Sequence, residues 1–194
     1  MDLSAESLAC IRGGRLVFRD LSFRADAGQL LSVEGANGAG KTSLLRMLAG
    51  FLAPASGTIR FGDVSDGEER GKHVGWLGHQ DGAKPQLTPR ETLAFTAALY
   101  GTKVSTALDA VGLSRTSDLP CQYLSAGQKK RLALARLKLS ARPLWLLDEP
   151  LAALDAAGKA LLQAMIAEHC AGGGLVIAAT HEPLGLDGQR LVLA

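Results

Sequence analysis

The chain has 194 residues, the length of one ordinary domain, and a formal net charge of only +2. Hydrophobic residues make up 47% and charged residues 21%, so a hydrophobic core is expected and intrinsic disorder is not. The weak charge does not indicate a nucleic-acid-binding surface. The uncharged run from Met47 to Ile59 contains Pro54 and is shorter than the roughly 20 residues that span a membrane, so no spanning helix is expected.

The three cysteines, Cys10, Cys121 and Cys170, show no C-x-x-C spacing, which argues against a disulfide framework and against a zinc site. The first seven residues include two acids and lack the basic start and apolar run of a secretory signal, so the protein is expected to stay inside the cell. Glycine accounts for 23 of the 194 residues, about 12%, against an average of about 7%. This excess predicts segments with unusual backbone conformations.

The first 30 residues predict an antiparallel sheet. Three segments look like short strands: Leu8–Ile11, Arg15–Phe18 and Leu21–Ala25. Gly13 and Gly14 form the expected turn between the first two, and the sheet is expected to flank a larger one.

From residue 30 onward, short apolar runs alternate with helical stretches. Strands are predicted at Leu30–Val33, Val74–Leu77, Leu144–Leu147, Leu175–Thr180 and Leu191–Leu193, and helices at Lys41–Ala49, Pro89–Tyr100, Gln128–Leu139 and Ala156–Cys170. Apolar runs this short are typical of parallel strands buried on both faces, so a three-layer α/β fold is expected. Between Gln80 and Ser125 prolines interrupt two or three helices, and we expect residues 81–124 to form a helical insertion in a single domain of residues 1–194.

The segment from Gly35 to Thr42 fits G-x-x-x-x-G-K-[ST] between a predicted strand and a predicted helix, which is the context of a phosphate-binding loop. In such a loop backbone N–H groups point at phosphate oxygens, the lysine reaches the β- and γ-phosphates, and the hydroxyl ligates Mg²⁺. The predicted nucleotide-binding residues here are Gly35, Asn37, Gly38, Gly40, Lys41, Thr42 and Ser43.

Two acids, Asp148 and Glu149, follow an apolar strand, and ligands of parallel sheets bind at the carboxyl ends of strands. Alone, such an ending is more typical of a solvated turn. Beside a phosphate loop, Asp148 is expected to hold Mg²⁺ through water and Glu149 to act as general base toward the attacking water.

The segment Leu124–Gln128 opens a predicted helix, and Ser125 and Gln128 have the spacing of a capping box. Taken alone, the capping box is a sufficient explanation. The order of motifs changes this interpretation: a phosphate loop, Gln80 at a strand end, a helical insertion, Leu-Ser-Ala-Gly-Gln, Asp-Glu, Leu154–Asp155, and His181 at another strand end.

This order resembles the ATP-binding subunits of ABC transporters over nearly the whole chain. The resemblance implies a P-loop NTPase with a three-layer parallel-sheet core, an N-terminal antiparallel β-subdomain and an inserted helical subdomain, with ATP and Mg²⁺ as ligands. It implies that two copies associate head to tail, so that Ser125, Gly127 and Gln128 of one copy contact the nucleotide bound by the other. It places Asp155 at the dimer contact, His181 at the γ-phosphate beside Glu149, and Gln80 at Mg²⁺ and the attacking water.

The sequence departs from that family at two positions. Ala126 replaces the glycine that the family commonly has in the segment Leu124–Gln128, its signature segment, and adds one methyl group there. The aromatic residue that usually stacks on adenine is replaced by Arg12. A guanidinium plane can stack on a base, and a plain surface arginine is an equal alternative.

Local strings resemble one branch of the family, the CcmA-type haem exporter ATP-binding subunits of bacterial cytochrome c maturation. They are Cys10–Arg12, Glu34–Gly38, Gly78–Lys84, Leu87–Leu93 and Leu144–Pro150. The branch implies a peripheral location on the cytoplasmic face of the inner membrane, beneath membrane subunits of the CcmB and CcmC kind, with ATP turnover driving release of the haem-loaded periplasmic chaperone. No haem ligand set is assigned.

Three alternatives share parts of the pattern. Another small ABC exporter, for lipoproteins or peptides, would have the same catalytic residues but other membrane subunits. A soluble nucleic-acid or translation ATPase of ABC type would need tandem domains or a long coiled coil, which the sequence does not indicate. A non-hydrolysing nucleotide sensor is disfavoured by Glu149 and His181.

Overall fold

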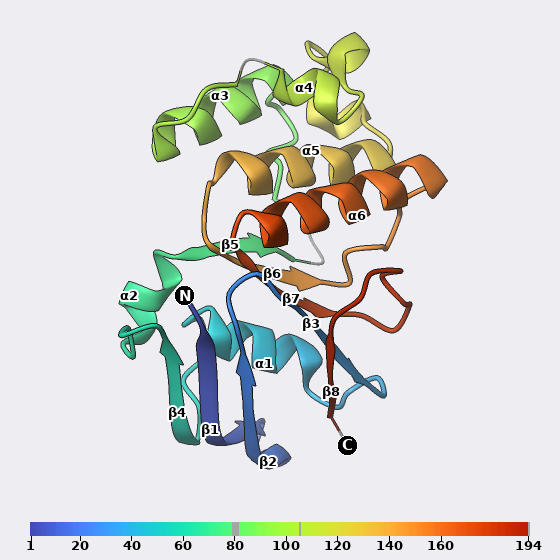
Figure 1. Cartoon of the computed structure of the whole chain (residues 1–194). Helices are drawn as coiled ribbons and strands as arrows, with labels where there is room; N and C mark the ends of the chain where they lie inside the picture. The colour runs from blue at the N-terminus through green and yellow to red at the C-terminus, as the bar shows by residue number, and fades with distance from the viewer. Residues whose placement is uncertain (79–81, 105, 194) are drawn as a thin grey trace.

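A computed structural model describes residues 1–78, 82–104 and 106–193, and its centre is a five-stranded parallel sheet (Figure 1). The strand order is β5 (Val74–Leu77), β6 (Leu144–Asp148), β7 (Leu175–Ala179), β3 (Leu30–Gly35) and β8 (Gln189–Leu193). All four neighbouring pairs are parallel. β6 and β7 are buried along their whole length, as expected for strands covered on both faces. The predicted α/β fold is confirmed.

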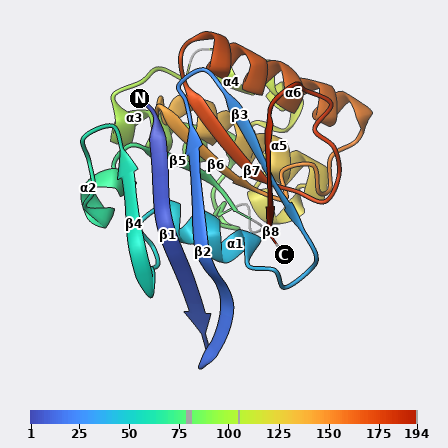
Figure 2. The same ribbon diagram turned by 60° about the horizontal axis from the view of Figure 1, so that its bottom comes forward.

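A three-stranded antiparallel sheet lies beside this core, in the order β2 (Arg15–Ala25), β1 (Leu3–Arg12) and β4 (Ser56–Phe61) (Figure 2). The sheet was predicted, but its three short strands were wrong, because β1 and β2 are two long strands. Ser7 and Asp20 have φ of 49° and 53°, and the β1–β2 register shifts between Ala5 and Leu8 and between Leu8 and Cys10. Irregularities of this kind bend a strand without ending it, so segments that looked separate are continuous.

Helix α1 (Lys41–Leu48) lies between the two sheets (Figures 1 and 2). Its buried side chains share one core with both sheets; they are Leu44, Leu45, Met47 and Leu48. The short helix α2 (Gly67–Gly71) was not predicted from the sequence. Its Arg70 is 3% exposed and donates to the carbonyls of Met47 and Leu48 at the end of α1. A buried cation thus satisfies carbonyls that have no partner within the helix.

Helices α5 (Ala126–Leu139) and α6 (Ala156–Ala171) cover the opposite face of the parallel sheet (Figure 1). A second core joins Leu134 and Leu137 of α5 and Leu162 of α6 to strand residues such as Leu147 and Val176. The helices, the sheet and α1 therefore form the predicted three layers. α6 has 16 residues, and within the described parts of the chain no helix is both long and apolar enough to span a bilayer.

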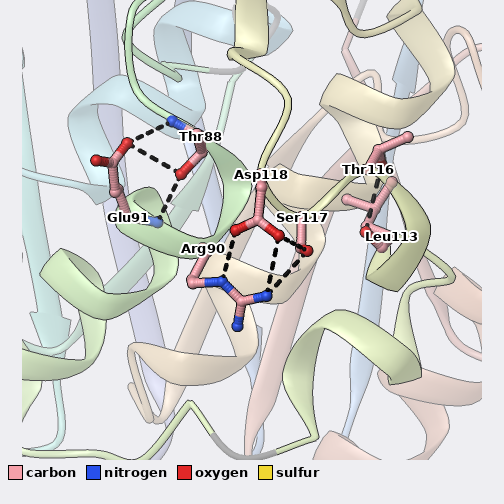
Figure 3. Close-up of polar contacts among 7 residues, drawn as sticks. All are labelled: Thr88, Arg90, Glu91, Leu113, Thr116, Ser117 and Asp118. Atoms are coloured by element: carbon pink, nitrogen blue, oxygen red, sulfur yellow. Dashed lines mark hydrogen bonds and ion pairs between the residues drawn. The ribbon is translucent and has the colours of Figure 1, made fainter.

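The chain between β5 and α5 folds into α3 (Pro89–Tyr100), α4 (Ala107–Ala110) and 3₁₀ turns at Ser114–Thr116 and Cys121–Tyr123. A third core packs Leu93 of α3 and Leu113 against Leu132 of α5. Thr88 and Glu91 form a capping box at the start of α3, and Arg90 forms an ion pair with Asp118, 2.8 Å away (Figure 3). These helices therefore lie on α5, on the far side from the sheet.

Candidate functional site

The phosphate loop connects β3 to α1 and depends on glycine at both ends. Gly35 has φ of 148°, and a Cβ there would lie 2.5 Å from the carbonyl oxygen of Leu193. Gly40 has φ of 100°, and its Cβ would lie 2.6 Å from Cγ1 of Val17. Both the left-handed backbone and the close approach of neighbouring strands exclude a side chain. Asn37 and Gly38 are exposed between these two points.

Lys41 is the first residue of α1 and is 8% exposed. Its ammonium group donates to the carbonyl oxygens of Gly35 and Ala36, at 2.7 and 3.2 Å. The positive charge therefore lies inside the loop, at the positive end of the α1 dipole. This arrangement favours an anion such as a phosphate group.

Thr42 and Asp148 meet at the carboxyl edge of the parallel sheet. The Thr42 hydroxyl donates to Oδ1 of Asp148 at 3.1 Å, although the two residues are 106 positions apart. Asp148 ends β6 and is 5% exposed. A hydroxyl and a carboxylate oxygen side by side are the hard oxygen ligands that Mg²⁺ prefers, so the residues present fit that ion. Gln80, the third predicted metal ligand, lies outside the described residues.

Glu149 and His181 also lie together. Nδ1 of His181 is 2.8 Å from Oε2 of Glu149. Glu149 has φ of 46°, a conformation that costs free energy for a residue with a Cβ, and its N–H donates to the carbonyl of Ala179 at the end of β7. Strained backbone held by its surroundings is concentrated at functional sites. The carboxylate is thus fixed between the ends of two neighbouring strands.

The signature segment lies on the other side of the sheet from α1. Ser125 caps α5, accepting from the N–H of Gln128 while the Gln128 side chain accepts from the N–H of Ser125. The predicted capping box is confirmed. Ser125 is exposed, whereas a Cβ at Gly127 would lie 3.1 Å from the carbonyl oxygen of Ala153. The start of α5 is therefore presented to the outside of the molecule.

Asp155 is the N-cap of α6. Its carboxylate accepts from the N–H of Gly158 at 2.8 Å and from Arg131 of α5 at 2.6 Å. Both contacts hold the pKa of Asp155 below its ordinary value, and the hydrogen bond from the Gly158 N–H has the larger effect. Through these contacts Asp155 has a structural role within this chain. Because its side chain is also exposed, it is accessible to a second copy.

Arg12 is the last residue of β1 and pairs with Arg15 across the Gly13–Gly14 turn. Its side chain is exposed. Stacking of Arg12 on a base therefore stays a prediction. Ser43, in the first turn of α1, is partly buried.

Two charged residues that connect the site to helices α5 and α6 were not predicted from the sequence. Arg131 and Lys159 lie on α5 and α6, and their partners Asp155 and Glu182 are 24 and 23 positions away. No local pattern connects residues so far apart. The position of Glu182 directly after His181 was the one available signal.

Comparison with known proteins agrees with this geometry. The family model described as ABC transporter matches residues 18–152. The cytochrome c biogenesis ATP-binding export protein CcmA of Rhodopseudomonas palustris (strain BisB5) is 48% identical, covering 98% of this chain and 97% of that protein. The protein of the same name from Nitrobacter winogradskyi is 47% identical with the same coverage.

Solved structures give the same fold. A putative ABC transporter ATP-binding protein from Pyrococcus furiosus superimposes with a TM-score of 0.87 at 24% identity, covering 100% of this chain and 98% of that one. The cbiO1 protein of Clostridium perfringens gives a TM-score of 0.78 at 26% identity, covering 93% and 78%. This chain therefore belongs to the ABC transporter family and, within it, to the CcmA branch of ATP-binding proteins.

Proposed function

We propose that this chain is the ATP-hydrolysing, energy-coupling subunit of an ABC complex for maturation of c-type cytochromes. The observation that carries the proposal is the convergence of Lys41, the Thr42–Asp148 contact and the Glu149–His181 contact at one sheet edge. The near-full-length similarity to CcmA proteins supports the branch. ATP hydrolysis is the activity of the ABC family. The role in cytochrome c maturation is inferred from the names of the CcmA relatives.

In this proposal the chain binds ATP through the phosphate loop. Gly35–Gly40 offer backbone N–H groups to the phosphates, and Lys41 exchanges its carbonyl partners for phosphate oxygens. Thr42 and Asp148 would hold Mg²⁺, which when bound supplies charge neutralisation to the phosphates. Gln80 is assigned to the same ion from its motif alone.

Glu149 is the general base in this mechanism. Its carboxylate orients the attacking water and takes its proton, and the strained backbone and the Ala179 contact hold it in place. His181 contacts Glu149 through Nδ1, and its side chain is 63% exposed, so we assign Nε2 to the γ-phosphate. The two residues thus act as a unit.

Hydrolysis is proposed to require a head-to-tail homodimer. Ser125, Gly127 and Gln128 sit at an exposed helix start on the opposite face of the sheet from α1. A helix N-terminus attracts anions, so this surface suits the γ-phosphate of a nucleotide held by a second copy. Asp155, exposed at the start of α6, is proposed to lie at the dimer contact, and Arg12 at the base.

A hollow of about 370 Å³ is proposed to receive the membrane subunits. Phe51, after α1, and Phe95 and Leu99, on one face of α3, line it and are 64%, 67% and 64% exposed. Trp76 of β5 forms an edge-to-face contact with Phe51 there. Large exposed apolar side chains gathered in one place mark interaction sites. The chain is therefore proposed to sit peripherally on the cytoplasmic face of the inner membrane, and no haem site is assigned to it.

The test is to purify tagged Glu149→Gln protein from membranes in the presence of ATP and identify what accompanies it. Recovery of membrane subunits of the CcmB and CcmC kind is expected, and recovery of an unrelated permease would contradict the proposal. Phe95→Asp should abolish this recovery while the isolated chain keeps its ATPase activity. Leu16→Asp, a control at an exposed apolar residue of β2, should leave recovery unchanged.

A further inference from the structure

Hydrogen bonds join the two residues that flank His181 in its loop, Thr180 and Glu182. The Thr180 hydroxyl donates to the carbonyl of Glu182 at 2.8 Å and accepts from the N–H of Glu182 at 3.1 Å. The Glu182 carboxylate in turn lies 2.7 Å from Nζ of Lys159 on α6. The backbone after His181 is therefore tied both to the end of β7 and to a helix.

The turn of α6 that carries Lys159 is itself held in place. The N–H of Lys159 donates to the carbonyl of Asp155, the N-cap residue, at 2.9 Å. Asp155 also accepts from Arg131 on α5. Lys159 thus projects from a capped helix start that is fixed to the neighbouring helix, which limits the positions that Glu182 can take.

We propose that Lys159 is a positioning residue for ATP hydrolysis: through its ion pair with Glu182 it holds the loop so that Nδ1 of His181 meets Glu149. The proposal deepens the function proposed above and rests on it, since it assumes that Glu149 and His181 act on ATP. Lys159 acts through His181 and is not itself catalytic. The contact with Lys159 also keeps the pKa of Glu182 below its ordinary value, so the ion pair persists at neutral pH.

The chain offers a matched control. Lys138 and Glu168 form a second Lys–Glu pair between α5 and α6, also at 2.7 Å, near the C-terminal ends of both helices. The Lys159–Glu182 side chains are 39% and 48% exposed, and those of Lys138 and Glu168 are 52% and 66% exposed. Exposed pairs of this kind contribute little to folding stability, so replacing either Lys159 or Lys138 should not lower Tm appreciably.

The experiment compares Lys159→Met with Lys138→Met, which both keep the aliphatic stem and remove the charge. Lys159→Met should lower kcat about two- to fivefold, in keeping with the modest strength of an exposed pair, and change KM for ATP less, because a small displacement of a catalytic group affects the transition state more than binding. Lys138→Met should match the parent. Lys159→Arg should restore most of the lost kcat, since it keeps a cation opposite Glu182.

A double-substitution test separates positioning from a general effect. Glu182→Gln should lower kcat as much as Lys159→Met, and the two together should lower it no further. In a His181→Ala background, Lys159→Met should have no additional effect. Parental kcat in Lys159→Met, or a full additional loss in the His181→Ala background, would overturn the positioning role. Failure of the underlying function is distinguishable, because Glu149→Gln would then hydrolyse ATP at the parental rate.

Discussion

Glu149 and His181 follow the ends of two neighbouring strands, β6 and β7, and one contact of 2.8 Å joins their side chains. Because the strands are parallel and adjacent, their carboxyl ends deliver both side chains to the same edge. The carboxylate therefore has a fixed orientation before any substrate arrives, which is the arrangement expected of a general base.

Replacing Glu149 with glutamine should leave ATP binding intact and lower turnover about 10²- to 10⁴-fold, the usual contribution of a general base. The amide preserves size and a hydrogen-bonding oxygen but does not take a proton. ATP should then accumulate in a trapped dimer, measurable by gel filtration with and without ATP. Turnover at the parental rate would refute the role assigned to Glu149.

Lys41→Ala should weaken ATP binding roughly 100-fold, because the cation inside the loop is lost and its hydrogen bonds to phosphate oxygens with it. Equilibrium binding of a fluorescent ATP analogue would measure this. Lys72→Ala removes an exposed lysine that pairs with Glu69 and should bind ATP like the parent. Equal affinity in all three proteins would exclude Lys41 from the nucleotide site.

The sharing of one nucleotide between two chains can be tested by mixing two inactive proteins. Gly127→Ala should leave ATP binding to the monomer within about twofold and lower turnover by about 10²-fold or more, since a contact near the transferred phosphate is disturbed. Lys41→Ala should also be inactive. In a mixed dimer, the loop of the Gly127→Ala chain meets the signature of the Lys41→Ala chain, so one site is intact. Activity of the mixture above the sum of its parts is expected, and its absence would contradict the shared site.

Much of the fold follows from local sequence patterns. β5 and α3 begin and end where predicted, because an apolar run and a Thr-Pro helix start are both local signals. The phosphate loop was predicted for the same reason. The roles of Asp148 and Glu149 depended on that loop, and the role of His181 depended on the order of motifs shared with the ABC family.

What the sequence did not predict depends on tertiary contacts. α2 has five residues with glycine at both ends and no apolar periodicity, and its Arg70 is buried against the end of α1. β4 begins with an exposed Ser-Gly-Thr and buries only two of its residues. The pairs Arg131–Asp155 and Lys159–Glu182 likewise form only when distant segments come together.

Arg70→Ala should lower the free energy of unfolding by about 3 kcal/mol or more. The guanidinium donates at 2.8, 3.0 and 2.9 Å to the carbonyls of Leu48, Met47 and Ser65, which would lose their charged partner in a buried place. Urea unfolding is the measurement. Arg46→Ala, which removes an exposed arginine of α1, should change stability by less than about 0.5 kcal/mol. A comparable small change in both variants would show that the Arg70 contacts do not hold α1.

His169 should make the stability of the protein depend on pH between neutrality and mild acid. Its ring stacks on Trp145 with centroids 3.9 Å apart, and Nε2 lies 3.2 Å from the carbonyl oxygen of Pro143. Burial lowers the pKa of His169 below 6.5, an effect that the Pro143 contact opposes. As pH falls through about 6.5, the unfolded chain binds this proton before the folded chain does, so the stability that is present above this pH is progressively lost.

The measurement is thermal unfolding at pH 7.5 and at pH 5.5 for the parent and for His169→Phe. The phenyl ring keeps an aromatic surface against Trp145 but does not titrate, so the variant should lose less Tm than the parent between the two conditions. Lys138 and Glu168 line a surface pocket together with His169. They and the titrating groups elsewhere are common to both proteins, so their effects cancel in the comparison. An equal loss of Tm in both would mean that His169 is protonated as easily in the folded chain as in the unfolded one.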